Sequence, residues 1–367
     1  MHSDIPLPTQ GRAGLADHRP LALRAGRAAG AVNAALRCLA LLAALLWAGQ
    51  ARADICSVTM SDVVFAGVSP ISPADAYASA SGNVKCTWAL LSPTPPYILL
   101  LPKVLVCIHI GIGTNATGAS PRTLGNGANR LEYNLYRDAT YSPASVAGGS
   151  GIAGTSPIAM VLVSPNLLIG GTLNAPFTLF GKIPAGPALR AVKTVDNADT
   201  VYSSSFAAAA TITYTYFNLL TPACGSGASA SFPFNVQATV VNNCNISTTP
   251  LHFGAGSVLS GPVRAQGSVS VQCVNNNAFQ IALNGGSVAG AVGARQMRRV
   301  GGAERINYQL SGSLDGPPWG DGTLGTTMLS GTGTGEVLPM ILYGRVPVQA
   351  SPRPGDYSDT VTATVVF

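Results

Sequence analysis

Cys56-Ser-Val-Thr-Met-Ser-Asp-Val-Val-Phe65-Ala-Gly67 has a counterpart later in the chain, Cys244-Asn-Ile-Ser-Thr-Thr-Pro-Leu-His-Phe253-Gly-Ala255. In both stretches a phenylalanine follows the cysteine by nine residues. A second cysteine follows the first by 30 residues in the early copy (Cys86) and by 29 in the late copy (Cys273). A repeat of this length predicts two copies of one structural unit. Features that both copies share therefore belong to the scaffold, and features of one copy alone are candidates for function.

The composition and the segment pattern indicate an all-β fold. The 367 residues include 42 glycines and 26 prolines, and charged residues make up only 10%. Segments such as Ser268-Val-Ser-Val-Gln272 and Thr360-Val-Thr-Ala-Thr-Val-Val-Phe367 alternate apolar and polar residues and are separated by turn residues. This pattern is typical of antiparallel β-sandwiches. We predict two sandwich domains in tandem, residues 54–220 and 232–367, joined by a small-residue linker over 221–231.

Further matches extend the repeat beyond its cysteines. Arg130-Leu-Glu-Tyr133-Asn-Leu135 corresponds to Arg305-Ile-Asn-Tyr308-Gln-Leu310, Leu179-Phe-Gly-Lys-Ile-Pro184 to Leu342-Tyr-Gly-Arg-Val-Pro347, Tyr202-Ser203 to Tyr357-Ser358, and Ile110-Gly111 to Asn284-Gly285. Both copies thus carry the same succession of strands.

Residues 1–53 are predicted to be a signal peptide with an N-terminal extension. Six arginines accompany the apolar run Cys38–Trp47, and Ala51-Arg-Ala53 supplies a small-x-small cleavage site before Asp54. The alternative is a transmembrane anchor, but this run is too short for the ~30 Å of a bilayer core. The expected route is secretion through the periplasm to the cell surface.

The net charge of +6 comes mostly from the predicted signal peptide. Beyond residue 53 the chain carries 15 basic and 13 acidic residues, so it has no strongly basic face for nucleic acid.

Six cysteines remain after the predicted cleavage, an even number that indicates disulfides in an exported protein. The repeat pairs Cys56 with Cys86 and Cys244 with Cys273, which leaves Cys107 for Cys224. Metal ligation is the alternative, but the CxxC and paired-histidine spacings of metal sites are absent from the sequence. We expect neither a metal nor a cofactor.

The spacings between matched residues are longer in the first copy at three places, which indicates insertions of 13, 12 and eight residues. Two of them carry apolar runs, and prolines stiffen the first. Apolar residues on long insertions either extend the core or form an exposed contact surface at one end of the domain. The candidate surface residues are Trp88, Leu90, Leu91, Tyr97, Ile98, Leu99, Leu100, Leu101, Met160, Leu162, Leu167, Leu168 and Ile169. The third insertion is more polar, so we expect a solvated hairpin there.

The second copy differs at both of its ends. An alternating segment over 232–240 precedes Cys244, and the final strand ends at Phe367. Only two residues separate the predicted cleavage site from Cys56, so we expect the first domain to have no strand to lend. An unfinished sheet in the second domain would leave a groove that another chain's strand could fill. Segment 232–240 either begins the second domain or reaches back to complete the first, and the sequence leaves both readings open.

Several motifs of the second copy together resemble the spore coat protein U domain, the pilin-like module of archaic (Csu-type) chaperone–usher pili. They include Gly267-Ser-Val-Ser-Val-Gln-Cys273, Ile281-Ala-Leu-Asn-Gly-Gly286, Ile306-Asn-Tyr308, Trp319-Gly-Asp-Gly322 and Gly355-Asp-Tyr357-Ser-Asp359. The first copy matches more loosely and lacks the Trp-Gly-Asp-Gly segment. The resemblance implies two immunoglobulin-like sandwiches, the second an incomplete pilin that needs a donor strand.

The resemblance also implies a biological setting. It makes the chain a two-domain tip adhesin whose first domain contacts an abiotic or host surface through apolar loops. The implied partners are a periplasmic chaperone, an outer-membrane usher and an adjacent pilin that donates a strand.

The sequence also allows three alternatives to the tip adhesin. An enzyme is disfavoured because His109 and His252 lie in strand-like runs, without a catalytic constellation around them in the sequence. A carbohydrate-binding module would use exposed aromatic residues such as Trp88, Tyr97, Tyr136 or Tyr141. A shaft pilin or a spore or outer-coat structural protein would carry the same pilin domain without a terminal position.

Overall fold

The computed structural model describes residues 54–88, 101–165, 171–256 and 258–367. The predicted signal peptide over 1–53 lies outside the described residues. Within them nearly all regular structure is β-strand, and α2 (Pro187–Arg190) is a single helical turn. The predicted all-β class is confirmed.

The first sandwich consists of strands β1–β12 in two sheets. One sheet has the order β1-β3-β8-β6-β5-β9-β12-β2 and the other has the order β11-β10-β4-β7. The strands are β1 (Ile55–Met60), β2 (Val63–Val68), β3 (Ala76–Trp88), β4 (Lys103–Ile110), β5 (Arg122–Asn126), β6 (Asn129–Tyr136), β7 (Ile158–Val163), β8 (Gly171–Ile183), β9 (Thr200–Ser205), β10 (Ala210–Phe217), β11 (Ala228–Ser231) and β12 (Asn235–Val240).

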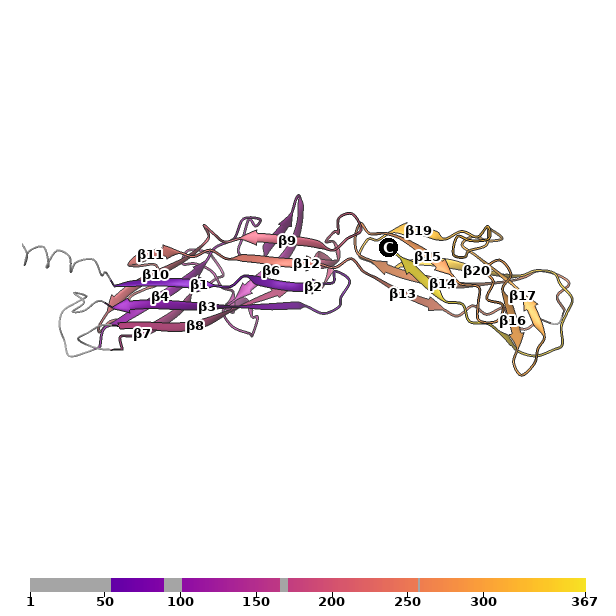
Figure 1. Ribbon diagram of the computed structural model, residues 1–367, viewed down its shortest axis with the longest axis horizontal. Coiled ribbons are helices and arrows are strands. Elements are labelled where there is room, and N and C mark those ends of the chain that lie inside the picture. The colour runs from indigo at the N-terminus through magenta and orange to yellow at the C-terminus, as the bar shows by residue number, and fades with distance from the viewer. Residues whose placement is uncertain (1–53, 89–100, 166–170, 257) are drawn as a thin grey trace, which may run out of the picture. The chain divides into compact units, whose positions relative to one another are not determined.

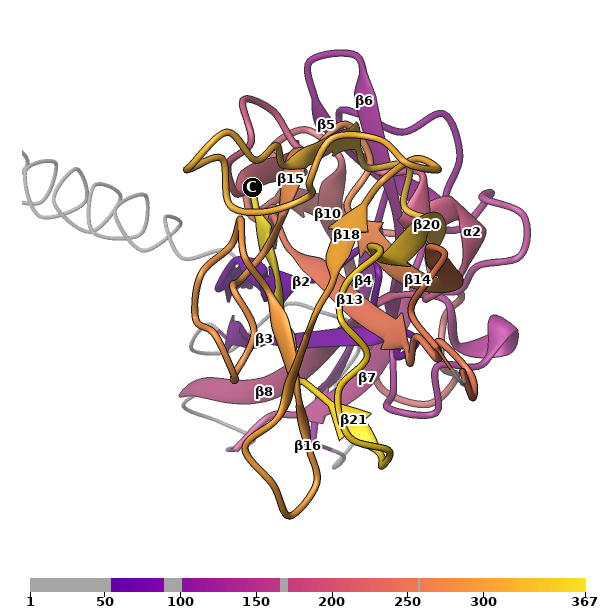
Figure 2. The same ribbon diagram turned by 90° about the vertical axis from the view of Figure 1, so that its right-hand side faces the viewer.

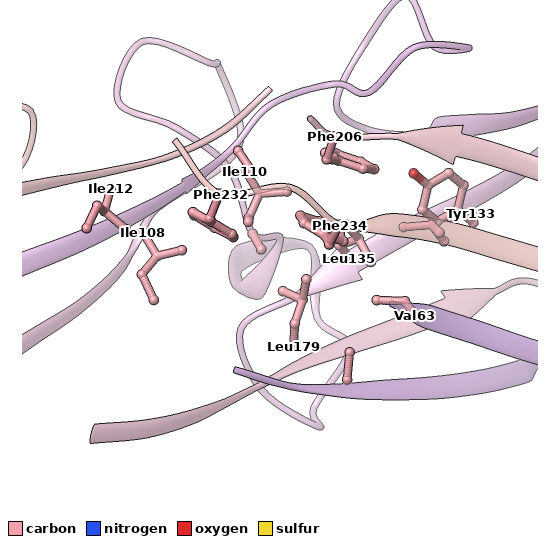
Figure 3. Packing of buried hydrophobic residues seen from close by; sticks show 14 of the residues in the cluster. Val63, Ile108, Ile110, Tyr133, Leu135, Leu179, Phe206, Ile212, Phe232 and Phe234 are labelled. Atoms are coloured by element: carbon pink, nitrogen blue, oxygen red, sulfur yellow. The ribbon is translucent and has the colours of Figure 1, made fainter. Parts of the chain in front are cut away.

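The core of the first sandwich is built by strands whose alternate residues point inward. Val104, Val106 and Ile108 of β4 are completely buried, and Ile212 of β10 packs with them. Figure 3 shows Ile108 and Ile212 in one cluster with Leu179 and with two phenylalanines, Phe232 and Phe234, from outside the predicted first domain. The first sandwich is therefore closed by residues beyond position 231.

The second sandwich is smaller and is divided into three short sheets with the orders β13-β14-β20-β18, β19-β15-β22 and β17-β16-β21. Figure 2 shows β13 and β14 beside β20 in the first of these. The strands are β13 (Cys244–Thr249), β14 (Val263–Cys273), β15 (Ala278–Leu283), β16 (Gln296–Arg299), β17 (Arg305–Asn307), β18 (Gln309–Ser311), β19 (Leu329–Thr332), β20 (Leu338–Val346), β21 (Tyr357–Ser358) and β22 (Ala363–Val366). Trp319 is completely buried here, and its indole N–H donates to the Ile281 carbonyl at 2.7 Å.

The repeat is visible in the disulfides. Cys56 faces Cys86 across the β1–β3 pair, and Cys244 faces Cys273 across the β13–β14 pair; both pairs are bonded and have a Cα–Cα distance of 4.1 Å. The third disulfide joins Cys107 of β4 to Cys224. All three pairs are those expected from the sequence.

Two buried arginines extend the correspondence and correct the sequence alignment by one residue. Arg122 donates to the carbonyls of Gly111 at 2.9 Å and Ile110 at 3.0 Å. Arg295 donates to the carbonyls of Asn284 at 2.8 Å and Leu283 at 3.1 Å. The pair Ile110-Gly111 therefore corresponds to Leu283-Asn284, and the predicted match with Asn284-Gly285 is wrong.

The predicted linker and second-domain boundary are also corrected. Residues 228–231 form β11, which pairs with β10, and Cys224 is bonded to β4, so the stretch 221–231 is part of the first sandwich. Segment 235–240 forms β12 in the first sandwich and is not the start of the second domain. The two corrections have different causes. Residues 221–231 are held by the β10–β11 hairpin and by the Cys107–Cys224 disulfide, and β12 is held by its pairing with β2 and β9.

Within the described residues, the structure contains no helix long and apolar enough to cross a membrane. A cluster of three or more metal-ligating side chains is likewise absent from the part of the chain that the structure describes.

Candidate functional site: an acceptor groove and an apolar edge

Strand β12 fills a gap in the first sandwich between β2 and β9, as Figure 1 shows. It runs parallel to β2, where Val236 faces Val63, and antiparallel to β9, where Ala238 faces Tyr202. The inward side chains of β12 and of the residues just before it are all buried: Phe232, Phe234, Val236, Ala238 and Val240. Phe234 stacks on Phe206 with ring centroids 4.6 Å apart. An alternating strand thus supplies one wall of the core.

The second sandwich has no counterpart of β12 among its described strands. Residues 251–256, which correspond to β2, pair with no strand, and β21, which corresponds to the start of β9, pairs only with β16. Two glycines support this correspondence. A side chain at Gly181 would collide with Phe65 and Val63, and one at Gly344 would collide with Phe253 and Leu251. The two copies therefore place the same residues around the missing strand.

Burial falls at each of these matched positions. Val63, Phe65 and Tyr202 are 0–1% exposed in the first sandwich. Their counterparts in the second sandwich, Leu251, Phe253 and Tyr357, are only half-buried. The difference is the one expected when a strand covers the first set and leaves the second set uncovered.

A groove of about 760 Å³ lies at this place in the second sandwich. One wall is formed by residues 251–256, Val258 and Leu259, and the other by residues 351–357. Its apolar lining consists of Leu251, Phe253, Val258, Leu259, Val263, Met297, Ile306 and Val346. We call this cavity the acceptor groove, because it occupies the position that β12 fills in the first copy.

A polar network holds the residues beside the acceptor groove. The Tyr308 hydroxyl donates to the Asp359 carboxylate at 2.6 Å, and the Tyr308 ring lies edge-on to Phe253 at 6.3 Å. Burial raises the pKa of Tyr308, and burial lowers the pKa of the neighbouring Arg295. Tyr308 thus supports Phe253 in the groove wall and is itself held by Asp359.

The apolar surface residues predicted from the insertions divide into three groups. Trp88 and Leu162 are buried, at 2% and 8% exposure, and Trp88 packs edge-on against Tyr216 at 6.0 Å. Their prediction as surface-contact residues is wrong, because strands β3 and β7 turn both side chains toward the core. Met160 is half-buried against the core, and Leu101 is 42% exposed. Nine others lie outside the described residues: Leu90, Leu91, Tyr97, Ile98, Leu99, Leu100, Leu167, Leu168 and Ile169.

Two exposed leucines were missed by the sequence comparison. Leu219 is 67% exposed and Leu220 is 89% exposed, on the loop that follows β10. Phe217 faces Lys103 across the β10–β4 pair, and Lys103 faces Val163 across the β4–β7 pair. The loop thus leaves the sheet at the edge where Leu101 and the exposed Val163 lie. A signal existed in the sequence, since an apolar pair stands just before a disulfide cysteine.

This edge, defined by Leu101, Val161, Val163, Leu219 and Leu220, is called the apolar edge below. It is held from within by Cys107–Cys224, which pins the loop after β10 onto β4. Leu105 and Phe217 pack around that disulfide.

His109 lies near the same disulfide and is buried. Its Nδ1 accepts the backbone N–H of Ser150 at 3.3 Å, and its Nε2 lies 2.9 Å from the Thr213 hydroxyl, which also accepts the Gly225 N–H. Burial lowers the pKa of His109. The imidazole joins two loops to the sheet, which is a structural role.

The chain is 32% identical over 156 residues to Protein U of Myxococcus xanthus, an alignment that covers 38% of this chain and 86% of that protein.

Among solved structures, one similar chain comes from the CsuC–CsuE chaperone–tip adhesion subunit pre-assembly complex of the archaic chaperone-usher Csu pili of Acinetobacter baumannii. The TM-score is 0.46 at 16% identity, over 85% of this chain and 100% of that chain. Another is the CupB6 tip adhesin from Pseudomonas aeruginosa, with a TM-score of 0.35 at 10% identity, over 86% of this chain and 95% of that chain.

The family model described as the Spore Coat Protein U domain matches twice, over residues 42–202 and 230–364. The two matches fall on the two copies of the repeat and together span most of the chain. The chain therefore belongs to the Spore Coat Protein U domain family.

Proposed function

We propose that this protein is the tip subunit of a chaperone–usher pilus, an adhesin and not an enzyme. The second sandwich joins the fibre by accepting a strand from the next subunit. The first sandwich contacts an abiotic or host surface through its apolar edge and the neighbouring insertions. The observation that carries the proposal is the contrast between a filled groove in the first copy and an open groove in the second.

The acceptor groove fits an extended strand and not a small molecule. Its two walls are backbone segments whose counterparts, β2 and β9, both hydrogen-bond to β12. An incoming strand would therefore gain main-chain hydrogen bonds on both sides and bury alternate side chains. Unpaired strand edges of this kind bind another strand or aggregate. This requirement explains why the protein would need a chaperone before assembly.

The first copy serves as a template for the incoming strand. Its inward residues are Phe232, Phe234, Val236, Ala238 and Val240. By the spacing of the repeat, the residue that replaces Val236 would face Leu251, and the residue that replaces Ala238 would face Phe253 and Tyr357. We expect a small residue at the second of these positions, because two aromatic side chains already flank it.

The closed first sandwich supports the proposed terminal position. Its groove is occupied by β12 of the same chain, so it has no place for a strand from another subunit. A shaft subunit would be joined to neighbours at both ends. A chain with one open and one closed sandwich is suited to the end of a fibre, with the closed sandwich outward.

The apolar edge is suited to contact with a hydrophobic surface. Leu219 and Leu220 are exposed on a loop that a disulfide anchors. Contact with a surface therefore requires little further ordering of this loop and little loss of conformational entropy. Burial of a leucine side chain is worth about 1.5–3 kcal/mol relative to exposure. Several such side chains on one edge would give adhesion without specific chemistry.

Immunogold labelling of the assembled fibre tests the proposal. An antibody against the first sandwich is expected to mark fibre ends only, while an antibody against a shaft pilin marks the whole length. Labelling along the length by the first antibody would contradict the tip assignment and favour the shaft pilin or coat protein.

A further inference from the structure

A cluster of four aromatic rings lies on the outer face of the sheet that contains β3, β8 and β6. Tyr141 lies at its centre, with ring-centroid distances of 4.7 Å to Tyr77, 5.4 Å to Tyr136 and 6.2 Å to Phe180. The other outward positions on β3 and β8 are mostly hydroxyl and amide side chains: Ser79, Ser81, Asn83, Thr87, Thr172, Asn174 and Thr178. The aromatic rings are thus concentrated at one corner of a polar face. We call them the tyrosine cluster.

The second sandwich shows that the scaffold does not need the three tyrosines. At the matching positions it has Arg264 for Tyr77 and Arg345 for Lys182, and Asp315 occupies the loop that follows β18. Asp315 forms an ion pair with Arg264 at 2.7 Å and a longer one with Arg345 at 3.6 Å. The loop is therefore closed by charges in one copy and by tyrosines in the other. Tyr77, Tyr136 and Tyr141 are thus specific to the first copy, whereas the position of Phe180 is also aromatic in the second copy, where it is Tyr343.

Tyr141 has a backbone conformation that a bulky residue rarely adopts. Its φ is +50°, in the left-handed region. The turn before it is fixed by Asp138, whose carboxylate accepts the Thr140 N–H at 3.0 Å and the Thr140 hydroxyl at 2.5 Å. Such conformations cost about 1–3 kcal/mol and are concentrated at functional sites. The strain presents the Tyr141 ring beside Tyr77, whose side chain stays 55% exposed.

A hydrogen-bond donor, Lys182, and a hydrogen-bond acceptor, Asp75, flank the rings. Lys182 and Asp75 form an ion pair at 2.7 Å, the Tyr77 hydroxyl donates to Asp75 at 3.3 Å, and the Lys182 ammonium lies 5.9 Å from the Tyr77 ring centre. The pair offers a donor and an acceptor with no net charge. A cationic ligand would have to compete with Lys182 for Asp75, and an anionic ligand would have to compete with Asp75 for Lys182. The chemistry therefore favours a neutral ligand with an apolar face and hydroxyl groups.

We propose that the tyrosine cluster is a binding site for a neutral pyranose-containing glycan. The C–H face of the sugar ring would stack on Tyr77 and Tyr141, and its hydroxyls would reach Asp75 and Lys182. Apolar rings with a few placed polar groups are the usual make-up of such sites. This site is separate from the apolar edge, so the protein would carry two modes of contact.

The test measures binding of neutral oligosaccharides to the purified mature chain. A strand with the sequence of residues 232–240 is appended to every variant, so that the open groove does not promote aggregation. A glycan array identifies a binder, and titration calorimetry measures its affinity for the parent chain and for Tyr77→Ala, Tyr77→Phe and Tyr141→Ala. Tyr343→Ala, at the position in the second sandwich that matches Phe180, is the control.

We expect Tyr77→Ala and Tyr141→Ala to weaken binding by about tenfold or more, while Tyr77→Phe retains stacking and Tyr343→Ala has no effect. Circular dichroism on each variant separates a lost ring from a lost fold. Absence of binding by the folded parent chain to any neutral glycan would overturn the proposal. Binding that is unchanged in folded Tyr77→Ala would overturn it as well.

Discussion

Val236 of β12 and Val63 of β2 face each other across a parallel strand pair, and both are completely buried. The residue that matches Val63 in the second sandwich is Leu251, which lines the open acceptor groove. The Val63–Val236 pair of the first copy thus has only one half in the second copy, where Leu251 faces no strand equivalent to β12 among those described.

The first prediction concerns the open groove. A copy of residues 232–240, appended after Phe367 through a short glycine–serine linker, is expected to fill the acceptor groove, since β12 runs antiparallel to β9. The unmodified mature chain should aggregate, and the extended chain should be monomeric with a higher Tm. Gel filtration and thermal unfolding measure both.

The matched control for that experiment carries aspartate at the appended counterpart of Val236. This charge would be placed against Leu251, so the gain in Tm should be lost. A soluble, monomeric and cooperatively unfolding chain without any appended strand would contradict the open-groove interpretation.

The second prediction tests the size limit on the strand inside the first sandwich. Ala238 faces Tyr202 on one side and Phe65 on the other, and all three are buried. Ala238→Leu is expected to overpack this position and lower the free energy of unfolding by about 1–3 kcal/mol. Urea unfolding measures this change in the free energy of unfolding. Gln237→Leu, at the half-buried neighbour, is the control and should have a smaller effect.

The third prediction separates the apolar edge from the core. Leu219→Asp and Leu220→Asp should lower adhesion to hydrophobic plastic while changing the free energy of unfolding by no more than about 0.5 kcal/mol. Trp88→Ala should instead lower it by about 3–5 kcal/mol, because Trp88 is buried. Val201→Asp, 51% exposed on β9, is the matched surface control. Equal adhesion by the leucine variants and this control would remove these leucines from the contact surface.

The fourth prediction concerns the disulfide that anchors the apolar edge. Cys107 and Cys224 are 117 residues apart in sequence, and closure of so long a loop is worth roughly 4–5 kcal/mol in the chain-entropy model. The double variant Cys107→Ser/Cys224→Ser should lose stability of this order and also lose adhesion. Retained adhesion in a folded double variant would show that the loop after β10 needs no anchor.

The repeat made much of the fold predictable. Two cysteine pairs at matched spacing determine β1–β3 and β13–β14, and the remaining pair then follows. The burial of Trp88 could also have been predicted from the sequence. Trp88 stands two residues after the buried Cys86 on one strand, so both side chains point to the same face.

The assignment of residues 232–240 was not predictable. Their alternation fits a first strand of the second domain as well as a last strand of the first. The choice is made by hydrogen bonds to β2 and β9, and β2 lies more than 160 residues earlier in the chain. The exposed position of Leu219 and Leu220 was not predicted for another reason. Their loop follows the last strand that the two copies share, so a comparison of the copies gives no information about it.

The last prediction is a loss of stability at acidic pH caused by His109. Its Nδ1 accepts the Ser150 N–H, so this nitrogen must be unprotonated, and the Thr213 hydroxyl accepts from Nε2. Burial lowers the folded-state pKa of His109 below its ordinary value of 6.5. The unfolded chain therefore binds a proton more readily, and stability is full above pH 6.5 and falls as the pH drops through and below that value.

Urea unfolding between pH 8 and pH 5 measures this dependence. His109→Gln, which cannot titrate, should flatten the curve in this range, and His252→Gln, on the groove wall, is the matched control. Limited proteolysis follows the same titration, because protonation at Nδ1 removes the acceptor that holds Ser150. Cleavage near Ser150 should rise as the pH falls in the parent chain. A parent chain and a His109→Gln variant with the same pH dependence would rule out His109 as the group responsible.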